Sequence, residues 1–244
     1  VAVLGSGVMG SRIACHFAGV GLQVLLLDIQ PKDLPETAKP AERNKIVNDA
    51  LTAAIKSNPS PVYTKDVVKR IKTGNFTDNM KDIANCDWVI QLVFTDVEKY
   101  RKPGTLITSN TSGIPIHMMT EGRSDDFKKH FCGTHFFNPP RYLRLLEIIP
   151  TPHTNPRVID FLMHYGDVTL GKTTVLCKDT PAFIANRVGV FGMMAIMNAM
   201  EKLGLTIDEI DALTGPVIGR PKSATFRTAD VVGIDTLVKV AKGV

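Results

Sequence analysis

Short runs of hydrophobic residues alternate with stretches of helical spacing through the first 150 positions of the 244-residue chain. The first run, residues 1–4, precedes a glycine-rich turn and a helix-compatible stretch over residues 11–19, and a second run follows at residues 23–27. Short apolar runs that alternate with helical stretches are typical of parallel strands joined by crossover helices. We therefore expect an α/β fold with a doubly wound sheet covered by helices on both faces.

The strand pattern ends near residue 178. Later segments have helical spacing instead, at residues 181–200, 206–213 and 234–242. Proline is favoured in the first turn of a helix, so we expect the first of these helices to begin at Pro181. We accordingly predict a sheet-containing domain over residues 1–178 and a smaller all-helical domain over residues 179–244.

A glycine-rich turn joins the first strand to the first helix. It fits the pattern G-x-G-x-x-G, in which the first glycine permits a tight turn and the second lets the backbone approach a pyrophosphate. The third glycine allows close packing of helix and strand. Because the pyrophosphate would lie at the amides that open the helix, the predicted contacts are Gly5, Gly7, Val8, Met9 and Gly10.

An acidic residue, Asp28, ends the second strand about twenty residues after this turn. Its carboxylate would accept hydrogen bonds from the adenosine ribose hydroxyls and would repel a 2′-phosphate. The arrangement favours NAD as cofactor, and the nearby Lys32 keeps NADP open as an alternative. A glycine-rich turn without a ligand is the simpler interpretation, but strand, turn, helix and acid together favour dinucleotide binding.

A histidine and a glutamate stand in neighbouring apolar runs. His135 lies within residues 131–137, and Glu147 lies in the middle of residues 145–149. Both runs have the character of buried strands, where an ionisable pair is costly unless its members satisfy each other. A carboxylate that holds an imidazole also makes a general base, although a purely structural pair remains the alternative.

With these features, the chain resembles the L-3-hydroxyacyl-CoA dehydrogenase family, and the resemblance extends over nearly its whole length. The matching segments are AVLGSGVMGSRIA at the start, SNTSGIPI at residues 109–116, GTHFFNPPRYLRLLEIIP at 133–150, KDTPAFIANRVG at 178–189 and ADVVGIDT at 229–236. The resemblance implies a Rossmann-type domain followed by a helical domain, with NAD as cofactor and an acyl-CoA as substrate. It also adds Asn110 to the cofactor-binding residues.

The resemblance further implies a role for each catalytic residue. His135 takes the proton of the substrate hydroxyl while hydride leaves C3, and Glu147 orients and charge-stabilises the histidine. Ser112 and Asn186 match the polar residues that hold the substrate oxygens. Each has a simpler alternative, since Ser112 lies in a cluster typical of capping turns and Asn186 lies in a predicted helix, where it would usually be solvated.

Composition is that of an ordinary globular enzyme. The formal charge of +5 suits a phosphate-bearing substrate, and no basic run indicates nucleic acid. No apolar run reaches membrane-spanning length. The remaining histidines lack ligand spacing, so we expect no metal site. The scattered cysteines indicate free thiols in a reducing compartment, for which we expect a cytoplasmic location and keep a mitochondrial one open; they are Cys15, Cys86, Cys132 and Cys177.

The chain departs from the family pattern after its fourth strand. Family members continue there into a glutamate-containing segment beside the nicotinamide, before the next helix. Here the strand around Ile90 runs past Gln91 without a turn residue, although Val93, Val97 and Tyr100 have helical spacing. A strand cannot become a crossover helix without a connection. We hypothesise that residues are absent between Ile90 and Gln91; an intact peptide link there, with the two Cα atoms about 3.8 Å apart, would contradict the hypothesis.

The helical domain is shorter than is usual in the family, and residues 219–224 resemble the long multidomain members that also carry an enoyl-CoA hydratase unit. Family members commonly dimerise through this domain, so a homodimer is possible. Two functional alternatives remain open at this point: a dehydrogenase of 3-hydroxy acids or sugar acids of the L-gulonate type, and a non-catalytic NAD-binding structural protein.

Overall fold

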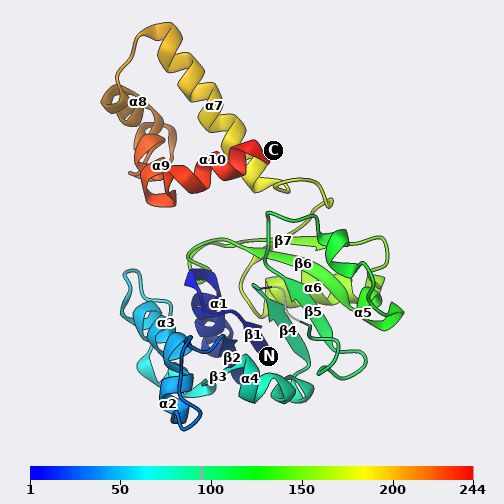
Figure 1. The fold of residues 1–244 in the computed structure, drawn as a ribbon. Helices are drawn as coiled ribbons and strands as arrows, with labels where there is room; N and C mark the ends of the chain where they lie inside the picture. Colours follow the sequence, from blue (N-terminus) through cyan, green and yellow to red (C-terminus); the bar gives the residue numbers. More distant parts are fainter. Residues whose placement is uncertain (94–95, 244) are drawn as a thin grey trace. The chain divides into compact units, whose positions relative to one another are not determined.

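The computed structural model describes residues 1–93 and 96–243 of the chain. The chain divides into two compact units, Val1–Asp179 and Thr180–Val244. The division predicted after Lys178 lies one residue before this point. Figure 1 shows a mixed α/β unit formed by the N-terminal part and a bundle of helices formed by the C-terminal part.

An eight-stranded sheet organises the first unit, in the order β3-β2-β1-β4-β5-β6-β7-β8. Its strands are β1 (Ala2–Leu4), β2 (Val24–Asp28), β3 (Ile71–Asn75), β4 (Trp88–Gln91), β5 (Leu106–Ser109), β6 (Phe131–Phe136), β7 (Leu145–Pro150) and β8 (Thr173–Leu176). The first six strands are parallel, β7 is antiparallel to β6, and β8 is parallel to β7. The strand order reverses between β1 and β4, which is where doubly wound folds bind their ligands.

Helices flank the sheet on both sides. They are α1 (Val8–Gly19), α2 (Pro40–Arg43), α3 (Lys45–Lys56), α4 (Phe76–Asn79), α5 (Asp125–Lys129) and α6 (Pro156–Val168), with 3-10 segments η1 (Lys65–Arg70), η2 (Met80–Asn85) and η3 (Ile116–Thr120). Apolar side chains of α1, α3 and α6 join one core with the inner residues of the strands. The predicted doubly wound α/β fold is confirmed.

The aromatic packing of this core determines which side of the sheet the histidine faces. Phe17 of α1 packs edge-on against Trp88 of β4 and Phe136 of β6, with ring centroids 5.1 and 6.1 Å apart. Successive side chains of a strand point to opposite faces. His135 therefore points away from α1, and Glu147, whose neighbours Leu146 and Ile148 belong to the same core, does the same.

The second unit consists of α7 (Ala185–Leu203), α8 (Ile207–Thr214), η4 (Pro216–Ile218), α9 (Phe226–Val232) and α10 (Ile234–Lys242). The prediction that a helix begins at Pro181 is wrong by four residues. Ala182 and Phe183 have φ angles of 59° and 53°, and two consecutive left-handed residues cannot continue a right-handed helix.

The connection from β4 to β5 also differs from the prediction. The chain pairs in regular register with β1 and β5 through Ile90 and Gln91. This pairing does not test whether residues are absent at the link, and that hypothesis stays a prediction. The prediction of a helix after β4 is wrong over residues 96–101, where the chain forms no helix. Residues 94 and 95 lie outside the described residues. The helical spacing of this segment reflects a single turn, closed by a bond from Arg101 N to Val97 O (2.9 Å).

Neither unit contains a helix that is long and apolar enough to cross a bilayer, as far as residues 1–93 and 96–243 are concerned. The four cysteines are free and buried.

Candidate active site

A groove of about 390 Å³ opens at the carboxyl ends of β1, β4 and β5. It contains all seven residues predicted to bind the cofactor and three others, and its lining consists of Gly5, Gly7, Val8, Met9, Gly10, Asp28, Leu92, Val93, Asn110 and Thr111. The position coincides with the reversal of strand order between β1 and β4. The glycine pattern pointed to the first five residues, whereas Leu92 and Val93 had no motif that would reveal them.

The glycine turn has the geometry that the pattern requires. Gly5 has a φ of +104°, and a Cβ atom on Gly10 would lie 1.8 Å from the carbonyl oxygen of Gly5. In contrast, a Cβ atom on Gly7 would meet no atom within 4 Å. Gly10 is therefore required by the packing of α1 against β1, whereas Gly7 leaves open space beside the helix N-terminus, where a phosphate group of a dinucleotide fits.

Asp28 binds the glycine turn itself. Its Oδ2 accepts hydrogen bonds from the backbone amide and the hydroxyl of Ser6, both at 2.5 Å, and its Oδ1 accepts one from the amide of Ile29 at 2.7 Å. A carboxylate has about four acceptor positions, so these bonds leave room for a ribose hydroxyl. The role in fixing the turn was not apparent from the sequence.

His135 and Glu147 face each other on the antiparallel strands β6 and β7, as directly paired residues. The distance between His135 Nδ1 and Glu147 Oε2 is 2.8 Å, and the residues are only 8 % and 0 % exposed. A carboxylate only accepts hydrogen bonds, so Nδ1 carries the proton in this pair. In the neutral imidazole the basic lone pair is then on Nε2. The expected contact between the two side chains is confirmed.

Two further side chains surround this pair. The rings of Phe137 and His135 make an edge-to-face contact with centroids 4.5 Å apart. The buried thiol of Cys177 lies beside Glu147, and burial, the charge of Glu147 and a hydrogen bond with it raise the pKa of this thiol to about 12. Cys177 thus stays protonated, and its thiol donates to the backbone oxygen of Val175 at 3.6 Å. The chain position of Cys177, at the end of β8, gave no signal of its place beside Glu147.

Asn110 links the groove to the histidine. Its backbone amide donates to Gln91 O at 3.0 Å, and its side-chain Oδ1 accepts from the amide of Phe136 at 2.8 Å, next to His135. Ser112 is half-buried two residues later. Asn186 lies in the first turn of α7 and belongs to the second unit, so its placement beside the substrate stays a prediction.

The loop over residues 137–144 connects β6 to β7 and is held by a buried lysine. Lys172 is 3 % exposed, and its ammonium group donates to the backbone oxygens of Leu143 (2.9 Å) and Pro140. Burial lowers its pKa from 10.5 to about 8. Arg12 Nη1 adds a bond of 2.6 Å to Asn138 Oδ1. The loop between the two paired residues is therefore attached to the rest of the unit at several points.

The buried Lys172 leads to a pH-dependent prediction. The unfolded chain keeps this proton up to about pH 10.5 and the folded chain only to about pH 8, so the contribution of Lys172 to the free energy of unfolding rises with pH between these values. We expect wild type to gain about 3 kcal/mol relative to Lys172→Met between pH 7 and 10.5. Urea unfolding followed by the fluorescence of Trp88, the single tryptophan, measures this difference.

The comparison with Lys172→Met is needed because the buried thiols change the free energy of unfolding with pH in the opposite direction to Lys172. The pKa values of Cys15, Cys132 and Cys177 are raised from 9.0 to about 12 by burial, so their contribution to stability is lost as the pH rises from 9 towards 12. Both proteins share this loss. Parallel stability curves for the two proteins would contradict the assignment of a lowered pKa to Lys172.

No group of three or more metal-ligating side chains occurs in the described part of the chain.

Comparison with known proteins gives matches over the full length. The family model of the "3-hydroxyacyl-CoA dehydrogenase, NAD binding domain" matches residues 1–180, and that of the "3-hydroxyacyl-CoA dehydrogenase, C-terminal domain" matches residues 183–244. A "Probable 3-hydroxyacyl-CoA dehydrogenase" of Bacillus subtilis is 48 % identical over 261 aligned positions, covering 100 % of the chain and 33 % of the relative. One of Deinococcus radiodurans is 45 % identical over 250 positions, covering 98 % of the chain and 70 % of the relative.

The fold has a counterpart among solved structures. The crystal structure of (S)-3-hydroxybutyryl-CoA dehydrogenase PaaH1 from Ralstonia eutropha superposes with a TM-score of 0.75 at 24 % identity, covering 98 % of the chain and 84 % of that structure. The chain spans about a third of the length of the Bacillus relative and 70 % of that of the Deinococcus relative.

Proposed function

The chain belongs to the 3-hydroxyacyl-CoA dehydrogenase family, and from this premise we propose that it oxidises L-3-hydroxyacyl-CoA to 3-ketoacyl-CoA in fatty-acid β-oxidation. NAD is the cofactor of the family's NAD-binding domain, which covers residues 1–180 here. The proposal assigns the general base to His135 and its orienting partner to Glu147.

The observation that supports this assignment most is the buried contact between His135 and Glu147, in which Nδ1 of His135 lies 2.8 Å from Glu147 Oε2. The next residue after His135, Phe136, is hydrogen-bonded to Asn110, which lines the cofactor groove. A base with a fixed tautomer thus lies close to the residues that line the dinucleotide groove, as hydride transfer requires.

Nε2 of His135 takes the proton of the C3 hydroxyl while the C3–H bond gives its electron pair as hydride, and the C3–O bond becomes a carbonyl. NAD supplies the hydride acceptor when it is bound. Glu147 stabilises the imidazolium that forms, since its charge lies in a buried environment where the attraction is strong. Ser112 and Asn186 would hold the substrate oxygens by neutral hydrogen bonds.

The residues of the groove fit the dinucleotide. Gly7 leaves room for a pyrophosphate at the start of α1, and Asp28 retains an acceptor position for a ribose hydroxyl. A 2′-phosphate would meet the same carboxylate and be repelled, which favours NAD over NADP.

The substrate class is tested by following NADH oxidation with acetoacetyl-CoA and with free acetoacetate under the same conditions. We expect turnover only with the thioester. Turnover of the free acid at a comparable rate would contradict coenzyme A dependence and favour a dehydrogenase of hydroxy acids or sugar acids. Absence of turnover with both compounds, with NADH binding intact, would favour a non-catalytic NAD-binding protein.

A further inference from the structure

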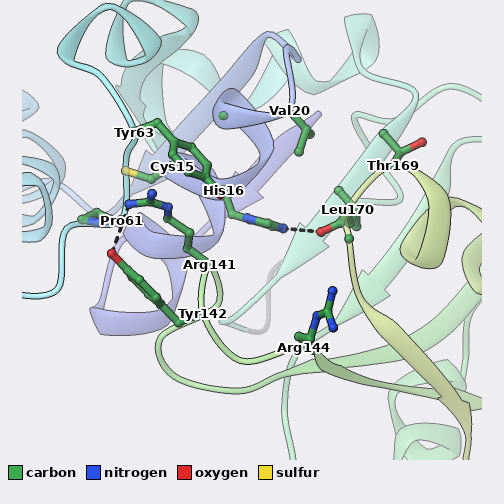
Figure 2. A pocket seen from close by; sticks show the side chains of 12 residues that line it. Cys15, His16, Val20, Pro61, Tyr63, Arg141, Tyr142, Arg144, Thr169 and Leu170 are labelled. Carbon is green, nitrogen blue, oxygen red and sulfur yellow. Dashed lines mark hydrogen bonds between the residues drawn. The ribbon is translucent and has the colours of Figure 1, made fainter.

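A second cavity lies in the first unit, on the side of the sheet that α1 covers and away from His135. Its volume is about 380 Å³, which is within the range of small-molecule sites. It lies between the C-terminal half of α1, the turn that follows α6 (residues 169–171), the loop after α3 and the loop over residues 137–144 (Figure 2). The side chains that matter for its chemistry are His16, Tyr63, Arg141, Tyr142 and Arg144.

Two arginines line this cavity, and no aspartate or glutamate is among the described residues that line it. Arg141 Nη1 donates to neutral oxygens only, those of Ser60 (2.9 Å), Val62 (3.2 Å) and the Tyr142 hydroxyl (3.1 Å). Within the described part of the chain, the exposed Arg144 side chain makes no hydrogen bond or ion pair. The cavity therefore has positive charge without a compensating carboxylate.

A buried cation next to the cavity, Lys172, adds to this imbalance, whereas the buried His16 is neutral at pH 7. Lys172 has only carbonyl oxygens as partners. His16 donates from Nε2 to Leu170 O at 3.0 Å, and its pKa is lowered to about 4 by burial and by the nearby charges of Lys172 and Arg141. Buried cations without a counter-charge are costly. An anion in the cavity would offset part of this cost.

The carboxyl ends of α1 and α6 also lie at this cavity and carry partial negative charge. They do not account for the two arginines, because their carbonyl oxygens bind other donors. Ala18 O accepts from Arg70 Nη1 at 3.0 Å and Phe17 O from the amide of Leu22. At the end of α6, Tyr165 O accepts from two backbone amides.

The walls also contain aromatic surface. The guanidinium of Arg141 lies 3.5 Å from the ring centroid of Tyr63, which is 74 % exposed, and Tyr142 is 46 % exposed. Figure 2 shows these three side chains grouped on one wall, with Arg144 on the opposite side of the hollow. The space exceeds what inorganic phosphate would fill, and exposed tyrosine rings favour stacking with a planar group.

We propose that this cavity is a binding site for a small phosphate ester that carries a planar ring, such as a nucleoside monophosphate. Arg144 binds the phosphate group by a charge-assisted bond, and the Tyr63–Arg141–Tyr142 wall contacts the ring. The site is separate from the dinucleotide groove, with which it shares no lining residue. Its ligand would contact the loop that connects the strands of His135 and Glu147.

The experiment measures binding of inorganic phosphate and of AMP by isothermal titration calorimetry, with the protein saturated with NADH and the ionic strength held constant with chloride. The proteins are wild type, Arg144→Gln and Arg157→Gln. Arg157 is a matched control, because it is an exposed arginine of the same unit that lines a different cavity. Arg144 is exposed, so its replacement should leave folding intact.

We expect both ligands to bind wild type and Arg157→Gln alike, with AMP tighter than phosphate, and Kd to rise by about tenfold or more in Arg144→Gln. An equal Kd in all three proteins would overturn the proposal, as would the absence of binding to wild type. Binding of AMP that disappears when NADH is present would assign it to the dinucleotide groove and overturn the proposal as well.

Discussion

We expect the His135→Gln variant to lose a factor of about 10² to 10⁴ in kcat, with an unchanged affinity for NADH. Glutamine is similar in size and can still donate to Glu147, but it has no basic nitrogen that titrates near neutral pH. His135 is not among the residues that line the dinucleotide groove, so cofactor binding should not depend on it. Steady-state kinetics with acetoacetyl-CoA and NADH, together with NADH fluorescence titration, measures both quantities.

His130→Gln serves as the matched control for this experiment. His130 also lies next to a carboxylate, with 3.3 Å between its Nδ1 and Asp126 Oδ1, but it belongs to the end of α5. We expect this variant to keep wild-type turnover. Unchanged turnover in His135→Gln would remove His135 as the base, and an equal loss in both variants would indicate a general effect on folding.

The Gly10→Ala variant should be destabilised by about 3 kcal/mol or more. The added Cβ atom would lie 1.8 Å from the carbonyl oxygen of Gly5, and neither partner is a flexible side chain that could move away. The helix α1 would have to shift from β1, which disturbs the core around Phe17. Urea unfolding monitored by Trp88 fluorescence measures the loss.

Gly7→Ala is the matched substitution in the same turn. Gly7 has a φ of −54°, which alanine adopts without strain, and its added Cβ would meet no atom within 4 Å. We expect a change in stability of less than about 1 kcal/mol but an increase in the Kd for NADH of about tenfold or more, since the methyl group would occupy the space of the pyrophosphate. Equal stability losses in both variants would contradict the different roles assigned to the two glycines.

Local patterns were sufficient to predict much of this architecture. The order of strand, glycine turn and helix depends on short-range conformational preferences, and α10 begins and ends at the predicted residues. The contact between His135 and Glu147 was also predictable, because each lies in a short apolar run and a buried ion pair must be mutually satisfied.

Local patterns failed where non-local contacts outweigh spacing. Pro181 looked like the first residue of a helix, but left-handed φ angles at Ala182 and Phe183 delay the helix to Ala185. The helical spacing after β4 reflects only one turn, and Val97 is fully buried without helical neighbours. In both places the apolar residues are buried against other parts of the chain and do not continue a helix.

The fold class, the glycine turn and the chemical types of the paired residues follow from local sequence, because each depends on neighbours within one strand, turn or helix. In contrast, two contacts arise from the packing of the folded chain: Asn110 joins the cofactor groove to the strand of His135, and Lys172 holds the loop between β6 and β7. These contacts join residues that are 26 and 29 positions apart, so they depend on the order in which strands enter the sheet, which no local spacing encodes.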